Sequence, residues 1–308
     1  RHTRFRNVTG VQTCALPISL AVWSWDHLTS KARLREWPDR VLVWNETQRR
    51  ELTELHHYAG NRVTVTGAQC FDQWFGRTPS RTREEYCRTV GLDPATPFVL
   101  YVCGALFRGS PSEAAFVSRW VERVRQSPRL RDVGILVRPH PQRMYEWDGV
   151  RLPDGVAFHG GHPIDQSGRD DYYDALYHAA AVVGLNTSAL IEAAIVDRPV
   201  FTILLPEFHE NQEGTFHFHH LMTVGEGFLN VSRSLDEHVG QLAACAGGAR
   251  TKPNVPFVEK FIRPFGRATA ATPRFAGAVE AVAATRAPAE GPTREREGSG
   301  TEIGRAHV

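Results

Sequence analysis

The sequence predicts an α/β protein made of two doubly wound domains, each built on a parallel sheet. Short apolar runs alternate with segments of helical periodicity along most of the chain. Runs such as 98–104 (FVLYVCG) and 133–137 (VGILV) are apolar without alternation, which is typical of parallel strands covered by helices on both faces. The alternation starts afresh after residue 97, so we expect two successive βα series and hence two domains.

The two series differ in length. The first domain is expected over residues 20–91, followed by a linker turn at 92–97. Its expected strands are 20–25, 41–44 and 63–67, and its expected helices are 46–58 and 80–91, the second ended by Gly91. The second domain is expected over 98–268, with strands at 98–104, 133–137, 156–160, 181–186 and 199–205, and helices at 110–126, 172–179, 187–196 and 235–248. A helix within 269–286 and a disordered tail at 287–308 complete the expected order.

The two ends of the chain have an unusual character. Residues 8–19 (VTGVQTCALPIS) resemble the translation of a common short-read sequencing adapter, and residues 302–308 (EIGRAHV) resemble a translation of its opposite strand. A weak signal peptide is the alternative for the first segment, although Gln12, Thr13 and Pro17 interrupt its apolar patch. We therefore exclude residues 1–19 and 302–308 from fold reasoning, and we expect a fragment of a longer protein with a truncated first domain.

The composition limits the function classes. The 308 residues include 36 basic and 34 acidic side chains, and a formal net charge of +2 offers no broad attraction for nucleic acid. The apolar runs are far shorter than the ~20 residues of a membrane span. The five cysteines form no CxxC pair and no metal-type spacing, so a reduced, cytoplasmic setting is expected.

A basic pair follows one of the expected strands directly. In GILVRPHPQR (134–143), the apolar run stops at Arg138, and prolines on both sides of His140 fix its backbone. Ligands of open parallel sheets gather at the carboxyl ends of strands, and a guanidinium matches the geometry of phosphate. Two interpretations are open: a phosphate contact, or an arginine–carboxylate brace beside a solvent-facing histidine.

A second constellation lies at the next strand end. GLNTSALIEAA (184–194) runs from a strand straight into a helix, which Asn186, Thr187 or Ser188 can cap. The first amides of that helix can hold an anion, and Glu192 lies one turn further on the side of Ser188, where it can accept from a ribose diol. An ordinary N-cap with an exposed glutamate is the alternative. GxGxxG and GxxxxGK[ST] fingerprints are absent from the sequence, which disfavours ordinary dinucleotide and P-loop sites.

The order of these two motifs resembles the C-terminal domain of GT-B-fold enzymes. The most similar group is the CDP-glycerol glycerophosphotransferase-like one, followed by nucleotide-sugar glycosyltransferases and non-hydrolysing UDP-sugar 2-epimerases. The resemblance covers roughly residues 20–285 and implies two Rossmann-like domains, the first on the acceptor side and the second binding the donor. It also implies that the Arg138–Pro141 segment meets a donor diphosphate, with a catalytic role for His140 as well, and that Asn186, Thr187, Ser188 and Glu192 bind phosphate and ribose.

The resemblance implies a transferase that moves a glycosyl or glycerophosphoryl group from a nucleotide-diphosphate donor to a cell-envelope polysaccharide. The donor is a co-substrate, so no cofactor is expected. The expected partners are the nucleotide-activated donor and a polysaccharide or lipid-linked acceptor at the inner membrane face, not nucleic acid. An isomerase of the 2-epimerase type and a non-catalytic nucleotide-binding module are the alternatives.

Two further segments are candidates for the site. In SWDHLTSK (24–31), Asp26 can act as general base on an acceptor hydroxyl and Lys31 can neutralise the leaving diphosphate; a simple Asx turn is the alternative. In the histidine-rich segment 209–222, His217 and His219 are expected on one strand face, and Gly214, Thr215 and His217 are expected to line the donor pocket. Gly104 and Ser110 are expected to contribute backbone contacts. No metal site is expected, because carboxylate or cysteine ligands are missing at a supporting spacing.

Overall fold

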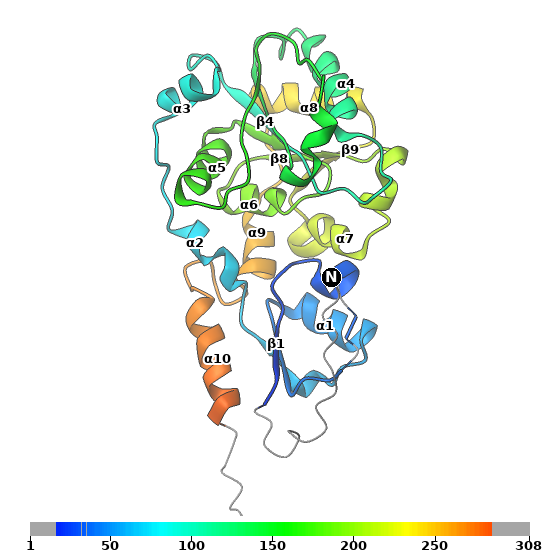
Figure 1. Cartoon of the computed structure of the whole chain (residues 1–308), viewed down its shortest axis with the longest axis vertical. Helices are drawn as coiled ribbons and strands as arrows, with labels where there is room; N and C mark the ends of the chain where they lie inside the picture. The colour runs from blue at the N-terminus through cyan, green and yellow to red at the C-terminus, as the bar shows by residue number, and fades with distance from the viewer. Residues whose placement is uncertain (1–16, 32, 35, 285–308) are drawn as a thin grey trace, which may run out of the picture.

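The chain folds into two α/β domains stacked along its long axis (Figure 1). This computed structural model describes residues 17–284 except 32 and 35. The small domain has a sheet of order β1–β2–β3, with β1 Ser19–Ala21, β2 Arg40–Val43 and β3 Val63–Val65. The large domain has a six-stranded sheet of order β6–β5–β4–β7–β8–β9, with β4 Phe98–Val102, β5 Gly134–Arg138, β6 Val156–Phe158, β7 Ala181–Val183, β8 Val200–Ile203 and β9 Leu229–Ser232.

Helices connect the strands. The α-helices are α1 Glu46–Leu55, α2 Asp72–Phe75, α3 Arg83–Val90, α4 Glu113–Arg125, α5 Gln166–His178, α6 Ala189–Ile195, α7 Phe216–Thr223, α8 Leu235–Ala246, α9 Val255–Phe257 and α10 Thr272–Ala284. The 3₁₀ and π turns are η1 His27–Lys31, η2 Gly60–Arg62, η3 Gln69–Phe71, η4 Pro141–Trp147, η5 Pro206–Asn211, η6 Val224–Glu226 and η7 Val258–Ile262. Within the described residues, no helix combines the length and apolar character that a membrane crossing requires.

The large sheet is parallel throughout, which confirms the predicted fold class. Its strand order runs outward from β4 in one direction to β6, and from β7 in the other direction to β9. The order therefore reverses between β4 and β7. In doubly wound sheets, the crevice beyond the carboxyl ends of the strands at such a switch point is where ligands bind.

The core explains why β4 is apolar without alternation. Leu100 packs with Leu176 and Leu190 on the face covered by α5 and α6. Its neighbour Tyr101 packs with Trp120 and Leu242 on the face covered by α4 and α8. Both faces of the strand are buried, so every position favours an apolar side chain.

One predicted domain boundary is wrong. The helix expected at 80–91 as the end of the first domain is α3, which packs against α5 of the large domain. Its Tyr86 and Cys87 are buried in the same core as Phe98 of β4. The chain therefore passes to the large domain before α3. The polar sequence of this helix did not indicate that it packs on the large domain.

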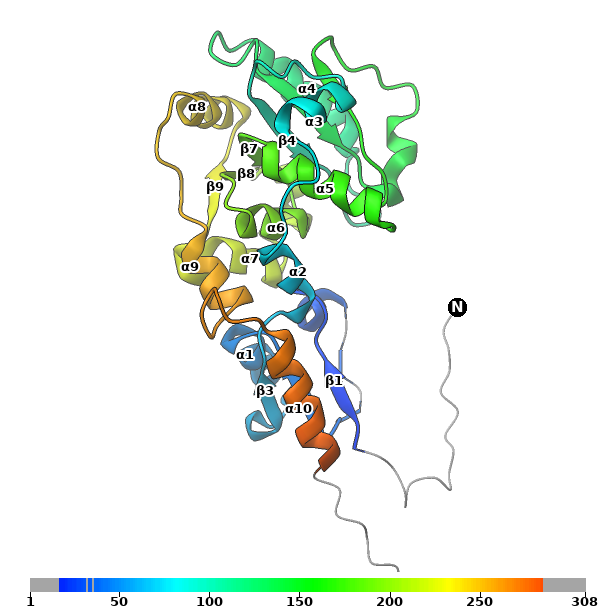
Figure 2. The same cartoon turned by 90° about the vertical axis from the view of Figure 1, so that its left-hand side faces the viewer.

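The C-terminal helix returns to the small domain. Figure 2 shows α10 alongside the strands of the small domain, and it contacts β2 and η3. Asp72 anchors its start, because its carboxylate accepts from the amides of Ala271 at 3.0 Å and Thr272 at 2.6 Å, and from Nη2 of Arg263 at 2.8 Å.

Other elements differ from the prediction in detail. Ser19, which we had excluded with the adapter-like segment, begins β1 and pairs with Arg40. Residues 216–223 form helix α7 instead of a strand, α5 begins at Gln166 instead of residue 172, and β9 was not predicted. The adapter-like stretches 8–16 and 302–308 and the tail expected to be disordered, 287–308, lie outside the described residues.

Candidate functional site

A cleft of two adjoining lobes lies where the small domain faces the carboxyl ends of β4, β5 and β7. The interdomain lobe, about 410 Å³, has walls from both domains: Ser24, Trp25, Asp26, Ser30, Lys31, Ala105, Leu106, Phe107, His140, Gln142, Asn186, Thr187, Ser188, Asn211 and His217. The inner lobe, about 300 Å³, belongs to the large domain: Val102, Cys103, Arg138, Pro139, His140, Pro141, Gln142, Gly161, His162, Pro163, Tyr172, Thr187, Ser188, Ala189 and Glu192. Both lobes share His140, Gln142, Thr187 and Ser188, so they adjoin each other along these residues.

Arg138 lines the inner lobe and is also braced. Its buried guanidinium donates from Nη1 to Oδ2 of Asp171 at 2.9 Å and lies 4.9 Å over the ring of Tyr172. Gly160, with φ of +112°, leaves room for it, because a Cβ there would lie 2.5 Å from Cζ of Arg138. The carboxylate brace therefore exists, and the braced side chain still faces the lobe.

Asp171 is the centre of this brace. Arg81 donates to it at 2.9 Å, and Nε2 of His159 lies 3.1 Å away. Burial alone would raise the pKa of Asp171, but the hydrogen bonds from His159, Arg138 and Arg81 outweigh it and hold that pKa well below its usual range. The carboxylate therefore stays ionised and fixes Arg138 in one position.

His140 is held as a neutral donor. Its Nδ1 accepts from the backbone N–H of Gln142 at 3.3 Å, so the ring proton lies on Nε2. Burial lowers the pKa of His140, and His162 and Arg143 lower it further. A neutral imidazole on the wall shared by both lobes can donate to a ligand oxygen.

The second constellation faces the same inner lobe. Thr187 and Ser188 precede α6, and the Ser188 hydroxyl makes no capping hydrogen bond, so it is available to a ligand. Glu192 accepts a short hydrogen bond from the hydroxyl of Tyr172, yet burial raises the pKa of Glu192 to about 7. Helix α6 has only seven residues, so we assign no anion site to its N-terminus. The polar groups of this wall are the hydroxyls of Thr187 and Ser188 and the carboxyl group of Glu192.

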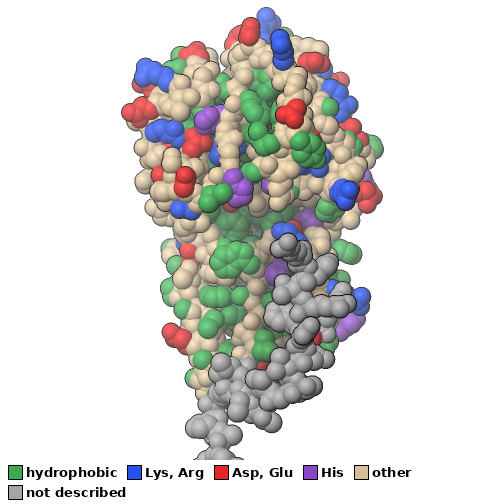
Figure 3. Space-filling view, viewed as in Figure 1, with side chains coloured by type: hydrophobic (Ala, Val, Ile, Leu, Met, Phe, Trp, Pro, Cys, Tyr) green, Lys and Arg blue, Asp and Glu red, His purple; other side chains and the backbone are tan. Residues whose placement is uncertain are grey.

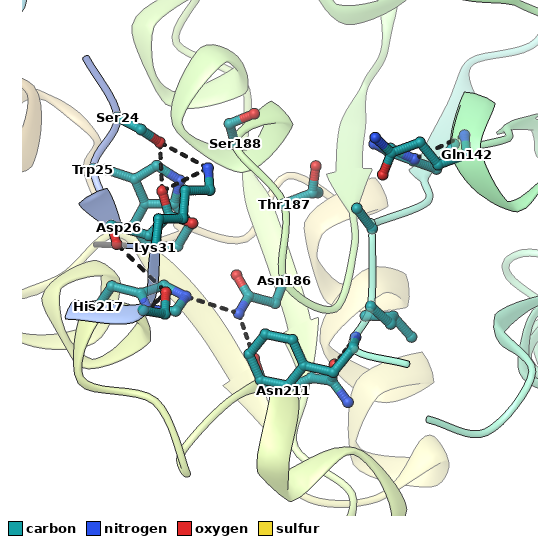
Figure 4. A pocket seen from close by; sticks show the side chains of 15 residues that line it. Ser24, Trp25, Asp26, Lys31, Gln142, Asn186, Thr187, Ser188, Asn211 and His217 are labelled. Carbon is teal, nitrogen blue, oxygen red and sulfur yellow. Dashed lines mark hydrogen bonds and ion pairs between the residues drawn. The ribbon is translucent and has the colours of Figure 1, made fainter. Parts of the chain in front are cut away.

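The small domain contributes Asp26 and Lys31 to the interdomain lobe. Nζ of Lys31 lies 2.8 Å from Oδ1 of Asp26 and donates to the Ser24 hydroxyl at 3.2 Å, and this hydroxyl also donates to Asp26 (Figure 4). The Lys31 side chain is 58% exposed, whereas that of Asp26 is 14% exposed. The carboxylate is thus fixed and the ammonium can move.

His217 joins the two domains. Nδ1 lies 3.3 Å from the hydroxyls of both Thr29 and Ser30 on η1, and Nε2 lies 3.4 Å from Nδ2 of Asn186. Its ring also meets Trp25 edge to face at 4.7 Å. Burial lowers the pKa of His217 to about 4, so the ring is neutral at pH 7. This histidine, which we expected to line a donor pocket, lines the interdomain lobe and not the inner lobe.

Several predicted site residues lie elsewhere. The N–H of Gly104 donates to buried Glu113 at 2.9 Å, and a Cβ at this glycine would lie 2.5 Å from the carbonyl oxygen of Asn186. The Thr215 hydroxyl is buried and donates to the Gln212 carbonyl at 2.8 Å. Gly104 therefore lets two loops approach, and neither residue lines the cleft; the same holds for Ser110 and Gly214.

The clustered histidines do not converge. His217 faces Asn186, whereas Nε2 of His219 lies 2.7 Å from the Glu213 carbonyl and His220 pairs with Glu51 at 2.5 Å. Among residues 17–284, apart from 32 and 35, no group of three or more His, Cys, Asp or Glu side chains is arranged to hold a metal ion.

The wall residues that sequence reasoning missed include Phe107, Gln142, Tyr172 and Asn211. Gln142 directly follows the Arg138–Pro141 segment, and Tyr172 begins the segment expected to be a helix at 172–179. Phe107 and Asn211 lie in the loop after β4 and in η5, and no local pattern links these segments. Their proximity depends on the tertiary fold.

Comparisons with known proteins agree on the fold. Neither a protein-family model nor a curated protein matches the chain. Among solved structures, the chain is similar to the MnaA–UDP complex of S. aureus, with 14% identity and a TM-score of 0.55 over 79% of this chain and 59% of that one. It is also similar to UDP-GlcNAc 2-epimerase from Neisseria meningitidis bound to UDP-GlcNAc, with 10% identity and a TM-score of 0.54 over 79% and 62%.

A third similarity is weaker. The wall teichoic acid polymerase TagF matches with 12% identity and a TM-score of 0.47 over 80% of this chain and 59% of that one. The chain thus spans about three fifths of the length of these proteins. Two parallel-sheet domains that face each other across the cleft, together with the first two similarities, show that the chain has the GT-B fold.

Proposed function

We propose that the chain is part of a transferase that moves a glycosyl or glycerophosphoryl group from a nucleotide-diphosphate donor to a cell-envelope polysaccharide or lipid-linked acceptor. The protein would act in the cytoplasm, at the inner face of the membrane. One observation carries the proposal: Arg138 and His140 from one strand end, and Thr187, Ser188 and Glu192 from another, line the same inner lobe at the switch point of the large sheet.

The donor nucleotide belongs in the inner lobe under this proposal. Arg138 and the Nε2–H of His140 donate to diphosphate oxygens, together with the Ser188 hydroxyl. The ionised form of Glu192 accepts from the ribose hydroxyls. Fixed donors of this kind stabilise the charge that develops on the leaving nucleotide, which is usually the largest contribution to catalysis.

The interdomain lobe then receives the transferred group and the acceptor. Asp26, which is mostly shielded from solvent, takes the proton of the acceptor hydroxyl as general base. It can do so once the exposed Lys31 turns from Asp26 to the leaving diphosphate. The two domains would thus supply the two halves of the reaction, acceptor activation and donor binding.

The proposal is tested by nucleotide binding and turnover. Titration calorimetry of the 308-residue chain with UDP, CDP and GDP should detect binding of at least one nucleotide. Arg138→Ala should weaken it by about tenfold or more, because a charge-assisted contact to phosphate is lost. Arg119→Ala is the matched control, since Arg119 pairs with Glu207 on the surface, away from the cleft.

Turnover separates the alternatives. Nucleotide release from a UDP- or CDP-linked donor that depends on added acceptor supports transfer. Epimerisation of the donor sugar without acceptor identifies an isomerase instead. Binding that Arg138→Ala leaves unchanged contradicts the phosphate assignment.

A further inference from the structure

We propose that the acceptor bound in the interdomain lobe is an uncharged carbohydrate whose ring stacks on Phe107, and not a polyol phosphate. This inference rests on the proposed function and names the chemistry of the acceptor, which the proposed function does not specify. Three features of the lobe carry it: the balance of its charges, an exposed aromatic ring on a backbone held by hydrogen bonds, and polar side chains on the same wall.

The lobe has no net charge. Among the described residues of its wall, the ionised side chains are Asp26 and Lys31, and they pair at 2.8 Å. The two histidines of the wall, His140 and His217, are neutral because burial lowers the pKa of each. A polyol-phosphate chain carries a negative charge on every repeat, and a partly enclosed anion without an unpaired cation loses more hydration energy than it regains.

The nearby cations are already engaged. Arg143 lies behind the wall in a short ion pair with Glu146 and donates to the Leu106 carbonyl at 3.0 Å. Arg138 faces the inner lobe, where the proposed function assigns it to the donor diphosphate. Acidic and basic side chains are interspersed over the large domain on the face shown in Figure 3, so this face offers no broad basic field either.

Phe107 presents an apolar ring at the mouth of the lobe. Its side chain is 46% exposed, which leaves apolar surface in water. The backbone that carries the ring is held in place, because the Phe107 N–H donates to Oδ1 of buried Asn211 at 2.8 Å and Arg143 donates to the preceding carbonyl at 3.0 Å. Because this backbone is already ordered, a ligand that covers the ring has to order only the two torsions of the Phe107 side chain, which costs little entropy.

A pyranose complements this surface. One face of a sugar ring presents C–H groups, and covering Phe107 with that face removes apolar area from water on both sides. The hydroxyls at the rim of the sugar can bond to the Gln142 side chain, which has no hydrogen bond to the described part of the chain, and to Ser30. A glycerol or ribitol phosphate chain is flexible and has no comparable flat apolar face.

Binding of defined probes tests the inference. The 308-residue chain, saturated with the nucleotide that binds it, is titrated by calorimetry with cellotetraose, chitotetraose, maltotetraose and a glycerol-phosphate trimer. We expect at least one neutral tetrasaccharide to bind more tightly than the trimer, with an affinity that changes little as salt is raised.

Substitutions at position 107 test whether the Phe107 ring stacks on the sugar. Phe107→Leu keeps an apolar side chain but removes the flat ring, and should weaken the tetrasaccharide by about tenfold while nucleotide affinity stays unchanged. Phe107→Tyr should restore binding. Arg108→Ala, a change at the exposed neighbour of Phe107, should leave tetrasaccharide affinity unaltered.

Three outcomes overturn the inference: tighter binding of the glycerol-phosphate trimer than of every tetrasaccharide, no binding of any tetrasaccharide to the nucleotide-bound chain, or unchanged sugar affinity in a folded Phe107→Leu variant. Failure of the proposed function has a different signature, because then none of UDP, CDP and GDP binds. In that case the same titrations are run without nucleotide, and the ranking of the probes still decides the chemistry of the lobe.

Discussion

The two lobes of the cleft are built in different ways. The inner lobe takes its polar groups from strand ends of one sheet and braces them from behind, as Asp171 does for Arg138. The interdomain lobe combines η1 of the small domain with loops of the large domain, and His217 provides a contact across the boundary. The inner lobe is therefore fixed by the fold of one domain, whereas the interdomain lobe depends on how two domains meet.

The largest expected effect concerns the brace of the inner lobe. Asp171→Ala removes the partner of buried Arg138 and half-buried Arg81, and should lower the free energy of unfolding by about 3 kcal/mol. Chemical denaturation measures the change. Asp170→Ala is the control, because its ion pair with Arg77 is more exposed and should contribute less than about 1 kcal/mol.

The pH dependence of Asp171 has a defined sign. A carboxylate whose pKa is lowered in the folded protein contributes stability that is present above its unfolded pKa of about 3.9 and is lost as pH falls below it. The difference in stability between wild type and Asp171→Ala should therefore shrink in acid. Equal differences at pH 7 and at pH 3 would mean that this ion pair is not what stabilises the inner lobe.

A moderate effect is expected at Glu192, which also lines the inner lobe and accepts from the hydroxyl of Tyr172. Because its pKa is raised to about 7, the fraction that is ionised and able to accept from a ribose increases as pH rises through neutrality. Nucleotide affinity of the wild type should rise between pH 6 and 8, and Glu192→Gln should remove that part of the rise and bind about tenfold more weakly at pH 8.

Titration calorimetry of both forms across this range measures the difference, and the comparison cancels the titration of the nucleotide itself. Tyr172→Phe adds a matched test, because it removes the hydrogen bond that favours the ionised form of Glu192. The midpoint of the pH dependence should then move to higher pH. If the nucleotide affinities of wild type and Glu192→Gln change with pH in the same way, Glu192 does not contact the ribose.

The two lobes also differ in how far the sequence predicts them. The motifs around Arg138, His140, Ser188 and Glu192 are local, because a strand end, two prolines and an i, i+4 spacing place side chains without knowledge of the remaining fold. The brace is not local, since Asp171 lies 33 residues from Arg138 and on a helix that the sequence placed too far along the chain.

The interdomain lobe was predicted less well for the same reason. Asp26, Lys31 and His217 were identified by residue type, but the alternation in 217–220 predicted a strand. The buried positions are instead His217, Phe218 and Leu221, whose i, i+1, i+4 spacing is that of a helix. Phe107 and Asn211 are 104 residues apart and come together only through the sheet order. Local sequence patterns predict where each strand ends. Which strand ends lie next to each other can be predicted only when the strand order of the sheet is known.

The smallest expected effect is at His217, which links η1 of the small domain to Asn186 of the large domain. His217→Ala should lower the free energy of unfolding at pH 7 by about 1 kcal/mol, because weak hydrogen bonds to Thr29, Ser30 and Asn186 are lost. Tetrasaccharide affinity should fall while nucleotide affinity is kept, since η1 loses its support and the inner lobe does not. His219→Ala, an exposed neighbour, is the control.

Acid should erase the difference between His217→Ala and wild type. A histidine whose pKa is lowered to about 4 contributes stability that is present above the ordinary value of about 6.5 and is lost as pH falls towards 4. Protonation also puts a hydrogen on Nε2, which can then no longer accept from Asn186. The unfolding curves should therefore converge with decreasing pH; if nucleotide affinity instead falls with sugar affinity at pH 7, the two lobes are one mechanical unit and the contrast between them fails.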